Sequence, residues 1–339
     1  MNLSLLQQLV TDQYINVQKH PTANLWIYNY AAKTQYEQLW NEVTLACRGL
    51  ILDSKGQVAA RPFPKFFNLA EHDPSELPDE PFEVFEKMDG SLGILYWVDD
   101  QPFIATRGSF SSDQAKHATA LLHERYNAVF PQLRRDVTYL FEIIYPDNRI
   151  VVDYGSINEL YLLGIIDNAT GDDLPNDPSL GFPLPSPHEG LTDWRHLHHQ
   201  PNPTNREGFV LRFQTGLRVK VKFEEYVRLH RLVTGVSNVT VWEHLAAGHS
   251  LDELLERVPD EFYHWVQQVV AELKSQFSAI ESACQAAFKV LDTRKDTALY
   301  FLTQSHPQVL FAMLDGKDYS GAIWKLVKPG WRKAWRVEG

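Results

Sequence analysis

Cysteine, net positive charge and long apolar runs are all scarce in this chain of 339 residues. Two cysteines, Cys47 and Cys284, are too few for a disulfide scaffold or a multi-cysteine zinc site, and they fit a reducing cytoplasm. The longest apolar stretch, around residues 160–166, is far shorter than the roughly 20 residues that a bilayer-spanning helix needs. The first residues also lack the basic segment of a signal peptide. We therefore expect a cytoplasmic protein with no membrane partner.

The charge balance is acidic, with 32 lysines and arginines against 43 aspartates and glutamates, a net charge of −11. This excess argues against a protein that coats nucleic acid nonspecifically. It leaves room for a local basic groove, because a ligand responds mainly to nearby charges. Residues 206–231 hold seven basic and three acidic side chains, and residues 317–339 hold six basic and two acidic ones. Either stretch is a candidate anion-binding surface or simply a solvated face.

Residues 1–235 are dominated by short segments rich in Val, Ile, Phe and Tyr that Gly, Asp, Asn and Pro interrupt, a pattern typical of strands. The predicted strands are Cys47–Asp53, Phe82–Met88, Leu92–Val98, Tyr139–Tyr145, Arg149–Tyr154, Tyr161–Ile166, Gly208–Phe213 and Leu217–Phe223. Helices are predicted near Leu3–Asn16, Tyr36–Thr44 and Ser112–Val129, and the proline-rich stretch Asp167–Arg206 is predicted to be a surface connection.

Residues 236–339 show a different pattern, in which apolar residues recur at steps of three and four, as between Leu251 and Ile280. This spacing predicts amphipathic helices with a buried apolar face. The chain is therefore expected to be an α+β protein. Antiparallel sheets flanked by helices fill residues 1–235, and an all-α domain fills residues 236–339.

Lys87, a candidate reactive residue, lies at the end of the predicted strand that begins at Phe82, in the sequence Lys87-Met88-Asp89-Gly90-Ser91. A glycine beside a lysine lets the backbone approach a phosphate closely. By average residue usage, Lys-x-Asp-Gly occurs by chance in about one of fourteen chains of this length, so the motif alone is weak evidence. An exposed Asp-Gly turn is the alternative interpretation.

A second group of charged residues follows downstream, where Glu207-Gly208 precedes Lys220-Val221-Lys222. Residues two apart on a strand face the same side, so Lys220 and Lys222 would repel each other unless an anion lies between them. A triphosphate would supply that charge. The alternative is a polar, exposed face of an edge strand.

Further polar residues complete an ordered set along the chain. Arg48-Gly49 and Lys65-Phe66-Phe67-Asn68 lie upstream, and Glu142 stands between the apolar residues Phe141 and Ile143. Because strand neighbours alternate, Glu142 points away from the apolar face, toward sugar hydroxyls, a metal or solvent. The complete order is Arg48, Lys65, Lys87-x-Asp89-Gly90, Glu142, Glu207-Gly208, Lys220-x-Lys222.

This ordered set resembles the covalent nucleotidyltransferase superfamily of DNA ligases, RNA ligases and mRNA capping enzymes. The resemblance narrows to the RNA ligase 1 family of T-even bacteriophages and runs from about Tyr28 to His230. The segments that carry it are Tyr28-Asn29-Tyr30-Ala31, Cys47-Arg48-Gly49, Lys65 to Leu69, Asp89 to Leu92, Arg107-Gly108-Ser109, Asp147 to Val151, Lys220 to Lys222 and Tyr226 to His230. Arg107 stands where that family has a lysine, which retains the cation.

The resemblance implies that Lys87 is the nucleophile that attacks ATP to form lysyl-AMP, assisted by Asp89. An ordinary lysine is protonated and inert at pH 7, so neighbouring cations, a metal and partial burial must free the amine. Lys65, Lys220 and Lys222 are the expected neighbours, and they also neutralise charge on the transferring phosphates. AMP then passes to an RNA 5′-phosphate, and a 3′-hydroxyl attacks that phosphate to complete ligation.

The remaining site roles are implied by the same resemblance. Glu142 is expected to hold the ribose hydroxyls, and Tyr28 and Phe67 to line the adenine pocket. The groups expected to contact the nucleotide or its phosphates are Arg48, Lys65, Lys87, Gly90, Arg107, Glu207, Lys220 and Lys222. Magnesium or manganese is the expected metal, near Glu207. Asp252 and Glu253 correspond to an acidic metal-binding pair of the phage enzymes, although acidic residues also favour the first turn of any helix.

The implied partners are RNA with 5′-phosphate and 3′-hydroxyl ends, nicked tRNA among them, and a separate kinase-phosphatase that heals ends. Three alternatives remain at this point: a DNA ligase, a capping guanylyltransferase, and a catalytically silent RNA-binding relative. The first two usually carry a strand-rich OB-fold, whereas residues 236–339 have helical spacing. A silent relative is expected to have lost at least one of Lys87, Glu207, Lys220 and Lys222, and all four are present.

Overall fold

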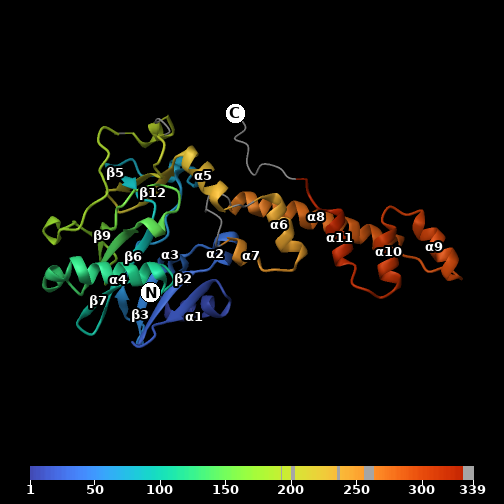
Figure 1. Ribbon diagram of the computed structural model, residues 1–339, viewed down its shortest axis with the longest axis horizontal. Coiled ribbons are helices and arrows are strands. Elements are labelled where there is room, and N and C mark those ends of the chain that lie inside the picture. Colours follow the sequence, from blue (N-terminus) through green and yellow to red (C-terminus); the bar gives the residue numbers. More distant parts are fainter. Residues whose placement is uncertain (192, 200–202, 235–236, 256–262, 331–339) are drawn as a thin grey trace. The chain divides into compact units, whose positions relative to one another are not determined.

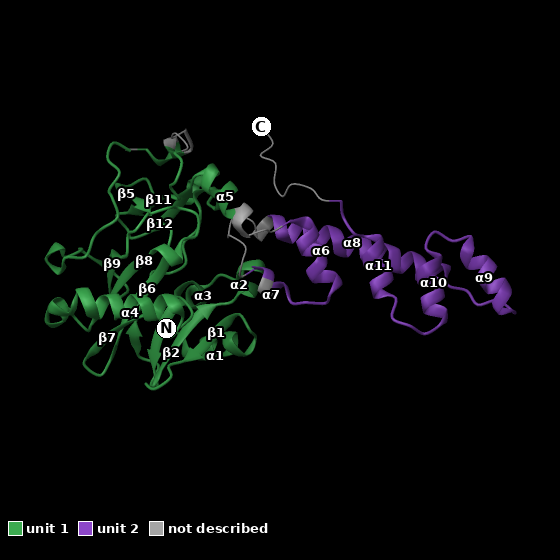
Figure 2. Ribbon diagram, viewed as in Figure 1, with its two compact units in different colours: residues 1–233 green, residues 234–339 purple. Residues whose placement is uncertain are grey.

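The computed structural model describes residues 1–191, 193–199, 203–234, 237–255 and 263–330. The chain divides into two compact units, residues 1–233 and residues 234–339 (Figure 2). Unit 1 contains the sheets, and the described part of unit 2 is helical (Figure 1). The expected α+β architecture with a helical C-terminal region is confirmed. None of the described helices is both long and apolar enough to cross a bilayer.

Unit 1 holds three sheets, in which every pairing of neighbouring strands is antiparallel. The four-stranded sheet contains, in order, β1 (Ile15–Lys19), β2 (Leu25–Tyr30), β3 (Arg48–Asp53) and β4 (Val58–Ala60). The five-stranded sheet contains β10 (Asp173–Leu174), β9 (Glu159–Asp167), β8 (Val137–Ile144), β6 (Ser91–Val98) and β7 (Gln101–Thr106). The three-stranded sheet contains β12 (Arg218–Lys222), β11 (Gly208–Phe213) and β5 (Phe82–Lys87).

The two larger sheets pack face to face around one apolar cluster, which includes Ile27 and Ile51 from one sheet and Ile94 and Leu140 from the other. Helices cover their outer faces. The helices of unit 1 are α1 (Leu3–Thr11), α2 (Ala32–Tyr36), α3 (Glu42–Ala46), α4 (Asp113–Arg125) and α5 (Glu224–Thr234). α4 packs on the five-stranded sheet through residues such as Leu122, and α1 contributes to the cluster behind the four-stranded sheet. This layering buries both faces of the central strands and fixes the positions at which they end.

Short 3₁₀ turns join these elements at Leu69–Glu71, Pro74–Glu76, Asn127–Gln132, Pro146–Asn148, Pro178–Leu180 and Trp194–His199. The connection between residues 167 and 206 was predicted to be a surface segment. Its described part instead contributes buried apolar side chains, among them those of Leu180, Phe182, Trp194 and Leu197. Apolar residues spaced too irregularly to predict an element can still reach the core from a loop.

Unit 2 contains α6 (Asn238–Ala246), α7 (Leu251–Leu255), α8 (Tyr263–Ala287), α9 (Arg294–Leu302), α10 (Pro307–Leu314) and α11 (Ser320–Leu326). Its core includes the fully buried Phe301, Val309 and Ile323. The apolar positions of the predicted helical stretch, such as Leu254 and Val269, are buried as expected. The described part of this unit contains no strand, so the OB-fold of DNA ligases and capping enzymes does not occur there.

Three predicted elements are wrong in part. The predicted helix Leu3–Asn16 ends at Thr11, because Gln13 adopts a positive φ of 63° and β1 begins at Ile15. The predicted helix Tyr36–Thr44 is two short helices, since Gln38 has a positive φ of 52° and Asn41 caps α3. The predicted strand Arg149–Tyr154 is irregular, for a reason that lies in the site itself.

Candidate active site

The three-stranded sheet places two of the predicted lysines in one row. Gly208 of β11 pairs with Lys87, the last residue of β5, and with Lys222, the last residue of β12. Glu207 precedes Gly208 and is 3% exposed. Its Oε2 lies 2.8 Å from Lys87 Nζ and its Oε1 lies 3.3 Å from Lys222 Nζ. The Glu207 carboxylate therefore lies between Lys87 and Lys222, whereas the anion expected between Lys220 and Lys222 stays a prediction.

The cationic face of β12 extends along the strand. Arg218, Lys220 and Lys222 alternate with Val219 and Val221, so the three cationic residues share one face. Arg218 binds Asp173 through two hydrogen bonds of 2.8 and 2.6 Å. The buried Lys220 donates its backbone N–H to the Phe67 carbonyl at 3.0 Å, which ties the Lys65-to-Asn68 segment to this strand.

Glu142 lies on β8 between Phe141 and Ile143, both fully buried. Its Oε1 accepts a 2.9 Å hydrogen bond from the N–H of Gly90, the residue after Asp89. Removal from water raises the pKa of Glu142 to about 7, the charge of Lys87 opposes this rise, and the charge of Glu207 adds to it. Glu142 thus belongs to the same electrostatic site as Lys87, Glu207 and Lys222, which we call the lysine row.

Arg48 also acts on this site, because its positive charge lowers the pKa of Glu142. The Arg48 guanidinium lies 5.2 Å from the centre of the Phe66 ring. The structure therefore brings together Arg48, Lys87, Glu142, Glu207 and Lys222. These residues come from four strands and the segment before β11, which are far apart in sequence.

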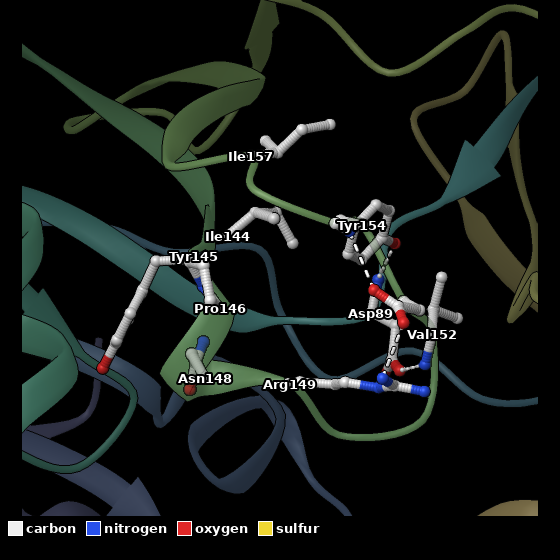
Figure 3. A pocket seen from close by; sticks show the side chains of 11 residues that line it. Asp89, Ile144, Tyr145, Pro146, Asn148, Arg149, Val152, Tyr154 and Ile157 are labelled. Atoms are coloured by element: carbon white, nitrogen blue, oxygen red, sulfur yellow. Dashed lines mark hydrogen bonds and ion pairs between the residues drawn. The ribbon is translucent and has the colours of Figure 1, made fainter.

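Asp89 is 3% exposed and is fully engaged by the protein. Its Oδ2 accepts the backbone N–H groups of Val151 and Val152 at 2.9 and 2.8 Å, and its Oδ1 accepts the Tyr226 hydroxyl at 2.7 Å. The Asp89 N–H in turn donates to the Tyr154 hydroxyl at 2.8 Å, as Figure 3 shows from close by. These bonds explain why residues 149–154 are not a strand, since a side chain has taken two of the donors that a ladder would use.

Lys65 lies in an aromatic environment. Its ammonium nitrogen is 5.3 Å from the centre of the Phe67 ring, 5.7 Å from that of Trp40 and 5.8 Å from that of Tyr30. The Gln35 Oε1 accepts a hydrogen bond from it at 3.4 Å. Rings that face a cation in this way stabilise its charge within a buried position.

Arg107, which is exposed, shares the Tyr30 ring with Lys65. Its guanidinium carbon lies 5.3 Å from the ring centre, and its Nη1 donates to the Tyr30 hydroxyl at 3.2 Å. Tyr28, two residues earlier on β2, packs instead against the cluster behind the four-stranded sheet that includes Cys47 and Leu50. Its described contacts are with that cluster, so its place in an adenine pocket stays a prediction.

The metal-binding predictions have a narrow structural basis. Among the residues that the structure describes, no three or more His, Cys, Asp or Glu side chains form a group able to hold a metal ion. Glu207 is the carboxylate next to Lys87, and both of its oxygens contact lysines. Asp252 and Glu253 lie on α7, but their side chains fall outside the described residues.

Several residues of this site have no role that was predicted from the sequence. Tyr226 and Tyr154 hold Asp89, whereas Tyr30, Trp40 and Gln35 surround Lys65. Tyr30 and Tyr226 stand within segments that carry the resemblance, which was the available indication. Gln35, Trp40 and Tyr154 belong to no motif, and their proximity comes only from the fold.

Comparison with known proteins places this geometry in context. Residues 46–179 match a family model described as RNA ligase. A putative RNA ligase from Thermovibrio ammonificans is 32% identical over 209 residues, which cover 57% of this chain and 54% of the relative. An RNA ligase from Rhodothermus phage RM378 is 23% identical, covering 87% of this chain and 86% of its own. Among solved structures, a putative ATP-dependent DNA ligase from Aquifex aeolicus covers 94% of this chain and 100% of its own, with a TM-score of 0.49 and 13% identity.

The lysine row and these sequence matches make the chain similar to RNA ligases of the nucleotidyltransferase superfamily. The similarity to the RNA ligase family model lies within residues 46–179. The chain spans about half the length of the Thermovibrio relative, 54% of it.

Proposed function

We propose that this protein is an ATP-dependent RNA ligase that joins 5′-phosphate and 3′-hydroxyl RNA ends through a lysyl-AMP intermediate. The observation that carries the proposal is the row of Lys87, Glu207 and Lys222 in a chain similar to RNA ligases. A lysine that ends a strand, is 21% exposed and has a second cation two strands away is suited to attack a polyphosphate.

In the proposed reaction, Lys87 Nζ bonds to the α-phosphorus of ATP, and the bond to the bridging oxygen breaks to release pyrophosphate. Lys222 and Lys220 balance the charge that develops on the phosphates, and Glu207 withdraws from Lys87 to let the amine attack. A 5′-phosphate oxygen of RNA then takes the adenylyl group and the phosphorus–nitrogen bond breaks. Finally, a 3′-hydroxyl attacks that 5′-phosphorus and AMP leaves.

A magnesium or manganese ion fits this site only together with a nucleotide. Mg²⁺ is commonly bound through one or two carboxylates plus substrate phosphates, and Glu207 offers one carboxylate beside Lys87. When bound, the metal would neutralise phosphate charge. We keep Asp252 and Glu253 as further candidate ligands.

Finer roles of the site residues belong to the same proposal. Asp89 acts by holding the loop that follows Lys87, because all its described bonds are to the protein. Lys65 and Arg48 supply positive charge, and Glu142 and Gly90 face the nucleotide from the loop side. Phe67 and Arg107 complete the nucleotide pocket around Tyr30.

For unit 2 we propose a role in RNA binding. Lys317, Lys325 and Lys328 are exposed, and the basic residues Arg332, Lys333 and Arg336 continue the series outside the described part of the chain. A local basic surface of this kind can attract RNA although the whole chain is acidic. Nicked tRNA is the substrate we propose, in a reducing cytoplasm that keeps the buried thiols of Cys47 and Cys284 intact. Breaks with other end chemistry would require a separate kinase-phosphatase.

The test is incubation with α-labelled ATP and magnesium, followed by denaturing electrophoresis. We expect label on the wild-type protein and on Lys55→Ala, in which an exposed lysine of a hairpin turn is lost. Lys87→Ala should carry no label. Equal labelling of Lys87→Ala, or an unlabelled wild-type protein, would contradict the proposal.

Changing the nucleotide or the nucleic acid in this assay separates the alternative functions. Labelling by GTP rather than ATP would indicate a capping guanylyltransferase. Transfer of AMP to DNA ends but not RNA ends would indicate a DNA ligase. A silent RNA-binding relative would bind RNA without becoming labelled.

A further inference from the structure

A cavity of about 230 Å³ adjoins the nucleophile loop on the side of Asp89. Its lining includes Ile144, Tyr145, Arg149, Tyr154 and Ile157. In Figure 3, Ile144 and Ile157 lie on one side and Asp89 and Tyr154 on the other, and the Tyr145 side chain points away from them. Lys87 is two residues from Asp89, yet the role proposed for ATP uses none of the lining residues except Asp89.

The backbone that forms this cavity is held firmly from several sides. Asp89 binds the Val151 and Val152 N–H groups, and Asn148 bonds both to the Ile143 carbonyl at 2.9 Å and to the Ser91 hydroxyl at 3.2 Å. These are polar bonds within a short loop that has no ladder of its own. These bonds therefore fix the loop in place, where it forms one wall of the cavity.

Asn205, which lies two residues before Glu207, also holds this loop through hydrogen bonds. Asn205 accepts the Asp153 N–H at 2.6 Å and donates to the Asp153 carbonyl at 2.9 Å, while its own φ is +59°. A non-glycine residue in this conformation is held there by its surroundings. The loop is thus bonded to the segment that contains Lys87 and to the segment that contains Glu207.

Side chains at the rim of this cavity are exposed, unlike the buried Val152 and Asn148. Ile157 is 38% exposed, an unusual fraction for an isoleucine, and Arg149 is paired with Asp153 at 2.7 Å on the rim, where both are about half exposed. The cavity thus combines aliphatic walls, one tyrosine, Tyr154, and a donor and an acceptor at its rim. This combination suits a nucleobase, which has apolar faces and a hydrogen-bonding edge.

We infer that this cavity binds one nucleotide of the RNA strand whose 5′-phosphate receives AMP from Lys87. The base lies between the side chains of Ile144 and Ile157, and Arg149 and Asp153 face its polar edge. The inference rests on the proposed function, because it assigns the RNA end to the side of the loop that ATP leaves unused. It makes Ile157 and Arg149 RNA-binding residues with no part in forming lysyl-AMP.

Ile157→Asp tests this inference, because it adds a negative charge to an exposed position that the core does not need. Val17→Asp is the matched control: Val17 is 42% exposed in the same unit and lines neither this cavity nor the neighbouring one that Ile157 also lines. A second pair is Arg149→Gln against Arg134→Gln, since Arg134 is also exposed and paired with a nearby aspartate, Asp136.

Three quantities are measured on the full chain: lysyl-AMP formation with ATP, AMP transfer from pre-labelled protein to a short 5′-phosphorylated RNA, and the affinity for that RNA by fluorescence anisotropy. We expect Ile157→Asp and Arg149→Gln to weaken RNA affinity and slow the transfer about tenfold, the size of a lost base contact. Lysyl-AMP formation should stay within about twofold of wild type. Both control variants should behave as wild type in all three measurements.

RNA affinity and transfer that are unchanged in both cavity variants would overturn the inference. It would also be overturned if lysyl-AMP formation fell as much as transfer, because the cavity would then serve the nucleotide or the fold. If no variant and no wild-type protein were labelled by ATP, the proposed function would fail. The anisotropy comparison between Ile157→Asp and Val17→Asp would still decide whether RNA occupies the cavity.

Discussion

Among single residues, Asp89 joins three parts of the chain next to Lys87. It binds Val151 and Val152 in the loop after β8 and Tyr226 on α5. The same Tyr226 ring lies 5.4 Å from Lys222 Nζ. One tyrosine therefore contacts both Asp89, two residues after Lys87, and Lys222, the cation on the far side of Glu207. We attribute to Tyr226 a positioning role, which sets where Lys87 and Lys222 lie.

Tyr226→Phe keeps the ring over Lys222 and removes only the hydroxyl that binds Asp89. Losing a hydrogen bond to a buried carboxylate is expected to cost about 1.5–3 kcal/mol of stability. If the bond positions Lys87, the rate of lysyl-AMP formation should fall about tenfold while the KM for ATP changes little. Single-turnover labelling over a range of ATP concentrations measures both.

Tyr126→Phe provides the control for that variant. The Tyr126 hydroxyl donates to the Glu159 carboxylate in the same unit, so its loss has a similar structural effect outside the lysine row. It should lower the melting temperature and leave the labelling rate unchanged. Equal slowing in both variants would mean that the Tyr226 bond acts only through stability.

Glu142 should make stability depend on pH in an unusual direction. Its pKa is about 7 in the folded protein against an ordinary value of 4.5, mainly because the carboxyl is removed from water. Between these two values the folded protein holds a proton that the unfolded chain has released, so raising the pH favours unfolding. The effect should level off once the pH exceeds about 7, where both states are ionised.

Comparison of wild type with Glu142→Gln isolates this contribution. The melting temperature of wild type should fall relative to that of the variant as the pH rises from about 4.5 to about 7. Glu124→Gln, the same chemical change on the exposed face of α4, controls for loss of a charge. A constant difference between wild type and Glu142→Gln across this range would show that Glu142 is not buried as a neutral acid.

At the scale of elements, the close pairing of β11 with β12 depends on one glycine. Gly208 has a φ of +156°, and a Cβ built there would lie 1.9 Å from the Val221 carbonyl oxygen and 2.8 Å from the Lys222 Cα. No side chain fits without separating the strands. Because Glu207 precedes Gly208 and Lys222 faces it, a shift here moves the centre of the lysine row.

Gly208→Ala should therefore abolish detectable lysyl-AMP formation and lower the melting temperature. Gly216→Ala, in the turn of the same hairpin, is the matched variant. It also has a positive φ, of 86°, but its Cβ would meet only the Asp173 carboxylate, at an ordinary 3.6 Å. Gly216→Ala should lose some stability and keep its labelling. Normal labelling of Gly208→Ala would show that the row tolerates strand separation.

The sequence predicted the elements of the site better than the contacts between them. Composition rich in Val, Ile, Phe and Tyr between turn residues correctly located β5, β8, β11 and β12. It failed at residues 149–154, where Asp89 takes the N–H groups that a strand would use. A bond between residues more than 60 positions apart leaves no trace in local spacing.

The same limit applies to the aromatic residues around Lys65. Tyr28 was predicted to line the adenine pocket, and the tyrosine that the structure places next to Lys65 is Tyr30. A register irregularity between Tyr28 and Asn29 in the pairing of β2 with β3 interrupts strict alternation there. Such a bulge changes which face a residue occupies, and only the paired strand reveals it.

At the scale of the whole molecule, the two units have separate cores, so we expect each unit to have its own free energy of unfolding. Phe141 is fully buried in the core of unit 1, and Phe301 is fully buried in that of unit 2. Truncating a buried phenylalanine to alanine costs about 3–5 kcal/mol, since it removes apolar contact and leaves a cavity. In a chain whose units unfold independently, that cost falls on one transition only.

Phe301→Ala should therefore lower the calorimetric transition of unit 2 and leave lysyl-AMP formation intact, because every residue of the lysine row lies in unit 1. Phe141→Ala should lower the other transition and reduce labelling, since Phe141 adjoins Glu142 on β8. If unit 2 binds RNA, Phe301→Ala should also weaken RNA affinity at temperatures above its lowered transition. A single transition that shifts equally in both variants would show that the units unfold together, and labelling would then be lost in both above that temperature.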